Sequence, residues 1–272
     1  RTIINNIVKN ILFILLIAST GYSSSWTPLT SDEISPYKKT IISSNDNEII
    51  ISFSLEGYSL TSVETEKGEA FKVGTMLGAS ILEKGAPDLQ KLSVSLKIPN
   101  NKRMSTKVKS SEYIQIENID IAPSKGNILR SIDPSKINFS WGDIYYSDSF
   151  YPGKLTDLNT PYIVRDFRGQ TANVYPFQYN PITKTLLIYT EIKISVYIDG
   201  PGQINVISNN EIDTIDYDFM KLYNVHFDNF NTNSTRFDYI EEQGNMLIIS
   251  HNDFIDEMQP FVDWKNTKGI PT

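Results

Sequence analysis

Two stretches of strict apolar and polar alternation constrain the fold of this chain most. They cover residues 90–98 and 186–198, and an apolar side chain recurs at every second position in most of each stretch. Successive side chains of a β-strand point to opposite faces, so this period is typical of strands with one buried face. The apolar positions are Leu92, Val94, Leu96 and Ile98 in the first stretch and Leu186, Ile188, Ile192, Ile194, Val196 and Ile198 in the second.

Other segments between residues 48 and 200 repeat the pattern and are separated by turn sequences such as "GAPD", "PNN", "PSKGN" and "DGPG". In "EYIQIENIDIA" the isoleucines change parity between Ile116 and Ile119, which indicates a β-bulge or a bend. In "AFKVGTMLGASILEKG" the apolar spacing leaves a short helix open, although two internal glycines weaken it. We therefore predict a mainly β protein, with an antiparallel β-sandwich over residues 25–202.

The pattern changes after this sandwich. Residues 203–236 are acidic, aromatic and rich in Asn, and we interpret them as an extended connector with a short helix near residues 217–223. "MLIIS" at 246–250 then predicts a buried strand, and the apolar spacing from Phe254 to Trp264 predicts an amphipathic helix that Gly269 ends. A buried strand followed by a helix is the first unit of an α/β domain, which we place at residues 237–272.

The N-terminal residues have the outline of a secretory signal peptide. Arg1 and Lys9 surround an apolar run from Ile11 to Ala18, and small polar residues follow. The alternative is a membrane anchor, but this run is shorter than the roughly 20 apolar residues that span a bilayer. We expect residues 1–24 to be removed, leaving a secreted or cell-surface protein with no stable membrane anchor. The chain starts without Met and stops soon after the predicted helix, so we interpret it as a fragment.

Composition excludes several kinds of site. The formal net charge is −7, and the most basic run is "NKR" at 101–103, so nucleic acid is not an expected partner. The chain contains no cysteine, which excludes disulfides, thiolate metal sites and a cysteine nucleophile within these residues. We assign no catalytic residue, metal ligand or cofactor.

Several long strings resemble the gingipain family of secreted bacterial cysteine peptidases. They are "GAPDLQKLSVSLKIP", "SSEYIQIENIDIAPSKGN", "IDPS", "FYPGKLTDLNTPYIVRDFRGQTANVYPFQYNPITKTLLIYT" and "FVDWKNTKG", which together span residues 85–268. The resemblance is weaker over residues 26–84. It implies a β-sandwich pro-domain that helps its own peptidase domain to fold and keeps it inactive in cis. It also implies that residues 237–272 begin a caspase-like α/β peptidase domain. The catalytic histidine and cysteine, and any calcium sites, would fall beyond Thr272.

The resemblance implies removal of the pro-domain by cleavage after a basic residue. Arg236, followed by Phe237, is the lone basic residue of a polar run, where an extended backbone is accessible to a protease. Lys102 and Arg103 offer a second, earlier cleavage site in another turn-like sequence. The alternative for Arg236 is an ordinary solvated linker residue.

The segment "FYPGKLTDLNTPYIVRDFRGQ" is the best candidate for an inhibitory contact, because it places basic side chains among turn residues. Candidates within it are Lys154, Asn159, Arg165 and Arg168. A basic side chain could enter an acidic specificity pocket without presenting a bond for cleavage. For Arg165 and Arg168 we favour ion pairs with Asp148, Asp157 or Asp166 inside the sandwich. Asn159 stands where a basic residue would be the natural plug, so the arginine specificity of the parent peptidase is in doubt.

A function of another class is also compatible with the strand pattern. A secreted adhesion or carbohydrate-binding module of an envelope protein would show the same alternation. The aromatic residues of 141–151 could then stack on sugars, although we favour core or interface packing for them. The long matching strings favour the pro-domain.

Overall fold

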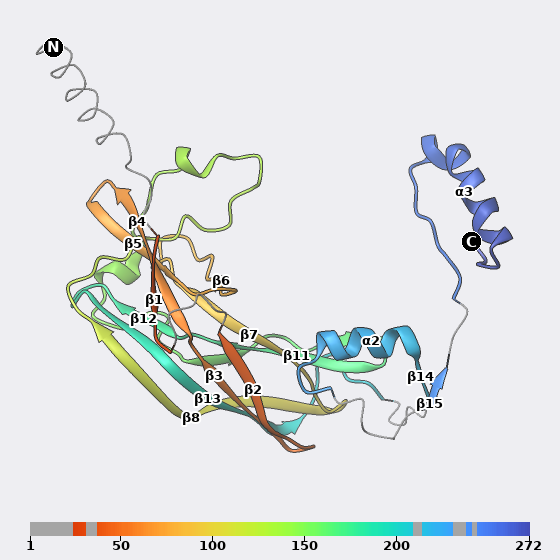
Figure 1. The fold of residues 1–272 in the computed structure, drawn as a ribbon, viewed down its shortest axis with the longest axis horizontal. Coiled ribbons are helices and arrows are strands. Elements are labelled where there is room, and N and C mark those ends of the chain that lie inside the picture. Colours follow the sequence, from red (N-terminus) through yellow and green to blue (C-terminus); the bar gives the residue numbers. More distant parts are fainter. Residues whose placement is uncertain (1–23, 31–36, 209–213, 231–237, 241–243) are drawn as a thin grey trace, which may run out of the picture. The chain divides into compact units, whose positions relative to one another are not determined.

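The computed structural model describes residues 24–30, 37–208, 214–230, 238–240 and 244–272 (Figure 1). The chain divides into two compact units, residues 1–208 and 209–272. The expected signal peptide therefore lies outside the described residues, except for Ser24, which opens β1.

The described part of the unit 1–208 consists of strands, turns and two short 3-10 helices. Its strands are β1 Ser24–Pro28, β2 Lys38–Ser44, β3 Glu48–Ser54, β4 Gly57–Thr65, β5 Gly68–Gly74, β6 Ala79–Ser80, β7 Gln90–Lys97, β8 Lys102–Ile116, β9 Thr156–Leu158, β10 Tyr162–Val164, β11 Phe167–Val174, β12 Phe177–Asn180 and β13 Thr185–Pro201. The 3-10 helices are η1 Pro134–Lys136 and η2 Asp143–Tyr146.

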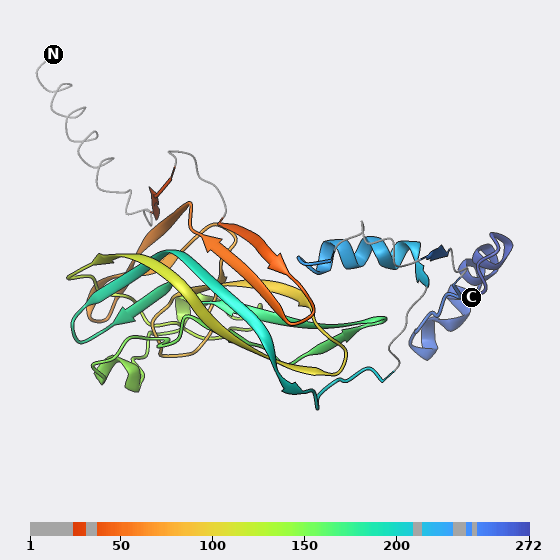
Figure 2. The same ribbon diagram turned by 90° about the horizontal axis from the view of Figure 1, so that it is seen from below.

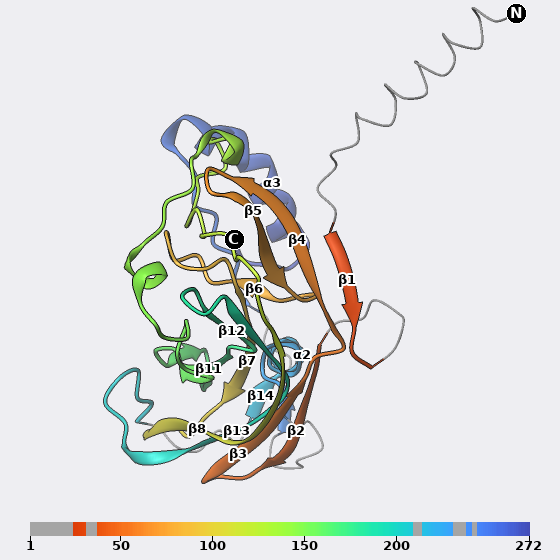
Figure 3. The same ribbon diagram turned by 90° about the vertical axis from the view of Figure 1, so that its left-hand side faces the viewer.

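Two five-stranded sheets form the body of this unit. One has the order β10-β11-β7-β6, with β9 also paired to β11, and the other has the order β12-β13-β3-β2, with β8 paired to β13. Figure 2 shows β8 and β13 running side by side along the unit. A smaller sheet has the order β1-β4-β5, and Figure 3 shows β1 beside β4. The paired strands of this unit are antiparallel, which confirms the predicted fold class.

The alternating stretches of the sequence supply the core between these sheets. Every second residue of β7 is buried, and β13 is buried at the predicted positions through Val196. Side chains of β3, β7, β11, β12 and β13 belong to one continuous apolar cluster. Burying a large aliphatic side chain stabilises the fold by about 1.5–3 kcal/mol, so this cluster is the main source of stability.

The parity change after β8 is a bend. The strand ends at Ile116, and Asn118 has a φ of 57°, in the left-handed region that an asparagine tolerates. Beyond it Ile119 and Ile121 are buried, and Ile121 forms a parallel bridge with Phe71 of β5. The bend thus moves the chain from one sheet to another.

The short helix left open near residues 70–82 is not formed. β5 occupies residues 68–74, and Leu77 has a φ of 65° in the turn that follows. Gly74 and Gly78 lie against the side chain of Gln90, where a Cβ would be within 2.7 and 2.3 Å of its atoms. Pairing with β4 and this close approach override the helical spacing.

The described part of the unit 209–272 contains two α-helices, one 3-10 helix and a parallel strand pair. Its elements are β14 Thr214–Asp216, α2 Tyr217–His226, β15 Asp238–Ile240, η3 Asn252–Phe254 and α3 Ile255–Thr267. Asp216 caps α2 by accepting hydrogen bonds from the backbone N–H groups of Asp218 and Phe219. The helices near 217–223 and 254–264 are confirmed, and Gly269, with a φ of 79°, follows the end of α3.

The prediction of a buried strand at 246–250 is wrong. Residues 244–251 have no regular structure, and Leu247 and Ile249 are 83% and 89% exposed. A strand requires a neighbouring strand for its backbone groups, and in the described part of the chain these residues pair with no strand, although Met246 N donates to Pro271 O at 2.7 Å. The parallel pair is instead β14 and β15, which lie on either side of α2 in the sequence.

Candidate functional site

Residues 156–164 lie along one edge of β11. β9 pairs with Ala172–Val174 and β10 pairs with Phe167–Gly169, while β7 occupies the opposite side of β11. Leu158 faces Ala172 and Tyr162 faces Gly169, so residues 159–161 stand opposite only two residues of β11. The extra residue makes a bulge at the sheet edge, and Asn159 and Thr160 at this bulge are exposed.

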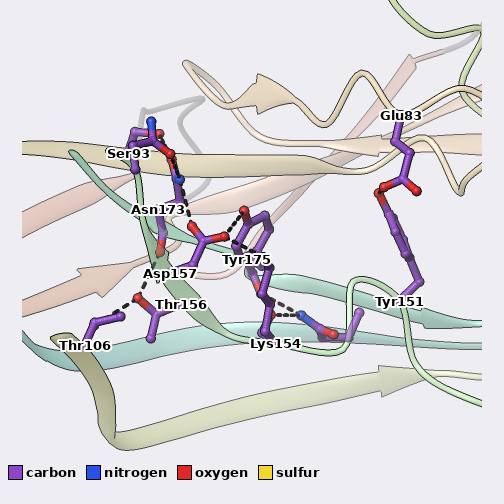
Figure 4. A network of polar contacts seen from close by, with 11 residues as sticks. Glu83, Ser93, Thr106, Tyr151, Lys154, Thr156, Asp157, Asn173 and Tyr175 are labelled. Carbon is purple, nitrogen blue, oxygen red and sulfur yellow. Dashed lines mark hydrogen bonds and ion pairs between the residues drawn. The ribbon is translucent and has the colours of Figure 1, made fainter. Parts of the chain in front are cut away.

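Asp157 links this edge to neighbouring polar side chains (Figure 4). Its Oδ2 atom accepts a hydrogen bond from the Tyr175 hydroxyl at 3.0 Å and pairs with Lys154 Nζ at 2.6 Å. Its Oδ1 atom accepts a hydrogen bond from Asn173 Nδ2 at 2.8 Å. Burial acts to raise the pKa of Asp157, but the hydrogen bonds from Lys154, Asn173 and Tyr175 together hold it below its usual value.

This lowered pKa predicts an acid-sensitive contribution to stability. Because the folded-state pKa lies below the unfolded-state value of about 3.9, the contribution is present above about pH 4 and lost as pH falls through the folded-state pKa. Urea unfolding of the wild-type chain and Asp157→Asn should differ most at pH 7, and the difference should shrink at pH 3. Asp120→Asn, which removes an exposed ion pair with Lys184, is the control. An Asp157→Asn difference that is the same at both pH values would contradict the prediction.

The Asp157 cluster, which consists of Lys154, Asp157, Asn173 and Tyr175, links the candidates Lys154 and Asn159. The Lys154 side chain is 53% exposed, and its ammonium group lies 5.5 Å from the centre of the Tyr175 ring. Asn159 Oδ1 accepts a hydrogen bond from Asn173 Nδ2 at 2.8 Å, and the Asn159 backbone N–H donates to Thr171 O at 2.9 Å. Both candidates are therefore presented at the surface by one buried set of contacts.

Arg168 does not belong to this surface, which corrects its selection as an inhibitory candidate. It is 1% exposed, and its guanidinium donates hydrogen bonds to the backbone carbonyls of Pro99 at 3.0 Å, Lys102 at 2.5 Å and Ile204 at 2.9 Å. The expected structural role holds, but backbone carbonyls replace the expected carboxylates. Arg165 has a φ of 45° at the turn between β10 and β11, and its Nε atom lies 3.6 Å from Asp166 Oδ1.

The sequence predicted a turn-like loop at Lys102 and Arg103, but the structure does not place them in one. They are the first two residues of β8, and Lys102 is in register with Pro201. The Lys102 carbonyl accepts from Arg168, while Arg103 donates to Asp199 O through Nε at 3.0 Å. A protease would have to break these contacts before it could bind the segment.

Arg236 and Phe237, the expected maturation site, lie outside the described residues. Their assignment stays a prediction. Among the described residues there is no helix long and apolar enough to cross a membrane, and no group of His, Cys, Asp or Glu residues suited to a metal ion.

The aromatic residues near 141–151 serve mainly in packing. The Tyr145 hydroxyl donates to Ile121 O at 2.8 Å, and burial raises its pKa. Tyr151 is buried and donates to Glu83 Oε2 at 2.9 Å (Figure 4). Lys67, at the tip of the β4–β5 hairpin, lies 4.4 Å from the centre of the Trp141 ring. Tyr146 and Phe150 are exposed.

Nothing in the sequence singles out three buried amide residues that contact residues 153–159. Gln170, Asn173 and Gln178 are 6%, 2% and 3% exposed. Each lies in a strand beside apolar residues, and an amide in such a strand is usually at a solvated face. Their strands, "FRGQTANV" and "FQYN", carry no apolar period that marks these amides as buried.

Comparisons with known proteins agree with this fold. The Propeptide_C25 family model matches residues 33–229. Gingipain R2 of Porphyromonas gingivalis is 37% identical over 234 residues, which are 85% of this chain and 31% of that protein. Gingipain R1 of the same organism is 36% identical over 239 residues, which are 87% of this chain and 24% of that protein. The chain thus spans about a third or less of the length of these curated relatives.

Two solved structures are similar to the chain. The complex of Porphyromonas gingivalis RgpB pro- and mature domains matches with a TM-score of 0.66 and 38% identity, covering 71% of this chain and 98% of that chain. A structure on the zymogenic latency of gingipain K matches with a TM-score of 0.55 and 22% identity, over 65% of this chain and 100% of that chain, and shows the fold alone. The resemblance to the gingipains is confirmed, and an adhesion module is not favoured. The chain belongs to the Propeptide_C25 family.

Proposed function

We propose that this chain is the pro-region of a secreted gingipain-like cysteine endopeptidase and keeps a peptidase domain of its own protein latent. The observation that carries the proposal is the similarity to a pro-domain solved in complex with its mature domain, over 98% of that solved chain. In cis, the pro-region is present at a high effective concentration, so modest intrinsic affinity keeps the peptidase inactive until the connector is cut. We also propose that it assists folding of that domain.

The proposed contact is the surface made by residues 151–164. This segment combines an exposed bulge at a sheet edge with a set of part-buried hydrogen bonds beneath it. Lys154 is the exposed basic residue of this segment. Its side chain contacts Asp157, and its backbone lies outside the paired strands. An acidic specificity pocket would replace Asp157 as its partner through a charge-assisted hydrogen bond.

Maturation and export complete the proposal. Residues 1–24 would direct the chain to the cell surface or the medium, and cleavage after Arg236 would end the cis arrangement. Calcium and the catalytic residues would belong to the peptidase domain beyond Thr272. The negative net charge supports the view that nucleic acid is not a partner.

An inhibition assay tests the contact. The chain should inhibit the parent peptidase domain in trans, and Lys154→Gln should weaken inhibition roughly tenfold, as expected for loss of one charge-assisted hydrogen bond. Residual activity would be measured against pro-region concentration with arginyl, lysyl and uncharged substrates. Lys184→Gln is a matched control, because Lys184 is 51% exposed and pairs with a single aspartate at 2.8 Å.

Other results would lead to different conclusions. Equal inhibition by the wild-type chain, Lys154→Gln and Asn159→Ala would place the contact outside residues 151–164. An active parent peptidase that ignores the wild-type chain would rule out inhibition and leave only assistance in folding.

A further inference from the structure

The three buried amides Gln170, Asn173 and Gln178 all bind the same short segment, residues 153–159. They come from β11 and β12, and each donates through its side-chain nitrogen to an oxygen atom of this segment. Buried amides cost free energy unless they are hydrogen-bonded, so their use in the interior beneath one exposed segment calls for a functional explanation.

Gln178 fixes the backbone on both sides of the Gly153–Lys154 peptide unit. Its Oε1 atom accepts a hydrogen bond from Gly153 N at 2.9 Å. Its Nε2 atom donates to Lys154 O at 2.9 Å and to Tyr175 O at 3.2 Å. The carbonyl of the Lys154–Leu155 bond therefore points at a buried donor, although the Lys154 side chain is half exposed.

Gln170 holds the backbone of Asn159, and Asn173 holds its side chain. Gln170 Nε2 donates to Asn159 O at 2.7 Å, which holds the carbonyl of the Asn159–Thr160 bond. Asn173 Nδ2 donates to both Asp157 Oδ1 and Asn159 Oδ1 at 2.8 Å. Asn173 is itself held by Ser93, whose hydroxyl donates to its Oδ1 atom at 3.0 Å.

Hydrolysis requires the opposite arrangement. A peptidase stabilises the oxyanion that forms on the scissile carbonyl, so this oxygen must be accessible to the enzyme's own donors. A carbonyl that is already bound to a buried amide has to be released first, and the amide is then left unpaired at a cost. Such a segment contacts an active site without being cut readily.

We infer that Gln178, Asn173 and Gln170 are positioning residues that hold residues 153–159 in one conformation, and that Gln178 and Gln170 withhold the Lys154 and Asn159 carbonyls from hydrolysis. The benefit to latency rests on the proposed function. Preorganisation would strengthen binding because little conformational entropy is lost on contact. Protection from cleavage would keep the inhibitor intact until the connector is cut.

Limited proteolysis of the 272-residue chain with trypsin tests this inference without the parent peptidase. Trypsin cuts after Lys and Arg, so the Lys154–Leu155 bond reports directly on the segment. Cleavage would be followed by mass spectrometry and expressed relative to the Arg130–Ser131 bond, which lies in an exposed segment without strand structure. Gln178→Met keeps the side-chain length but removes all three hydrogen bonds, and it should raise the relative rate at Lys154 roughly tenfold or more.

Asn180→Leu is the matched control. Asn180 is another buried amide of β12, 5% exposed, and it accepts from the backbone N–H groups of Ile182 and Thr183 at 3.0 and 3.3 Å. This variant should accelerate cleavage at Lys184–Thr185 in the turn it caps, and leave Lys154–Leu155 unchanged. Asn173→Leu should accelerate cleavage at Lys154–Leu155 by a smaller factor than Gln178→Met, because it releases Asp157 and Asn159 but leaves the Lys154 carbonyl bound to Gln178.

The inference is overturned if Lys154–Leu155 is cut as fast in the wild-type chain as in Gln178→Met. It is also overturned if Gln178→Met and Asn180→Leu each accelerate cleavage at Lys154–Leu155 and at Lys184–Thr185 equally, because the opening would then be global rather than local. Neither result depends on inhibition. A wild-type chain that resists trypsin at Lys154, becomes sensitive in Gln178→Met and does not inhibit its peptidase would refute the proposed latency and leave the positioning of the segment established.

Discussion

Replacement of Arg168 with methionine is expected to lower the free energy of unfolding of the unit 1–208 by about 2–4 kcal/mol. The guanidinium is buried and binds three carbonyls, two from the turn that holds Pro99 and Lys102 and one from Ile204. It thus joins two segments that are far apart in the sequence. Methionine fills much of the space of the side chain stem but donates no hydrogen bond. The three carbonyls then lose their partner together. Urea unfolding followed by tryptophan fluorescence would measure the change.

Two further variants give this experiment its controls. Arg168→Lys should recover only part of the loss, because an ammonium group lacks the planar fork that reaches three acceptors. Arg103→Met removes an arginine that is 60% exposed and bound to Asp199, and it should cost less than about 1 kcal/mol. Equal unfolding midpoints for Arg168→Met and Arg103→Met would show that the buried fork contributes little. Arg168→Met should also make the bond after Lys102 easier to cut, since its carbonyl is released.

Replacement of Arg236 with glutamine is expected to slow maturation of the full-length parent by roughly 100-fold or more. A protease pocket that recognises a basic side chain contains buried polar groups. These groups are left unpaired when glutamine replaces arginine, so the protease cleaves the variant much more slowly. Appearance of a mature N-terminus at Phe237 would be followed by mass spectrometry after expression of the parent. The precursor should accumulate in the variant.

The control for this experiment is Lys221→Gln, which removes a basic residue within α2. The ordered helix protects that position, so maturation should proceed at the wild-type rate. Normal maturation of Arg236→Gln, with the same N-terminus, would show that the connector is cut elsewhere. A new N-terminus close to residue 237 would instead show that the location is right and that the enzyme tolerates another residue.

Local pattern was sufficient to predict the sheets and both helices of the described chain. The alternation of β7 and β13 reports directly on one buried face, and the parity change at Ile119 corresponds to the turn at Asn118. These features depend on residues close together in sequence. The strand expected at 246–250 fails because a strand also needs a partner, which no local pattern provides.

The candidate site could be predicted only in part. The segment was selected from its turn residues and charges, and Lys154 and Asn159 do lie together in it. The structural role favoured for Arg168 holds, but its partners were not predicted, because they are backbone carbonyls 36 to 69 residues away in the sequence. The amides Gln170, Asn173 and Gln178 were not selected at all, since nothing in the sequence distinguishes a buried amide from a solvated one. Contacts between residues distant in the sequence determine both the partners of Arg168 and the burial of these amides.

The pairing of β3 with β13 has a consequence for how this protein folds. Contacts between these neighbouring strands join residues 139 and 147 positions apart, as between Ser52 and Glu191 or Glu48 and Ser195. High contact order slows folding, because a large loop must close before the strands stabilise each other. During synthesis β2 and β3 emerge early and must wait, with apolar faces uncovered, until β13 leaves the ribosome. The first two strands of this sheet are thus completed by its last strand, and the sandwich forms late in folding.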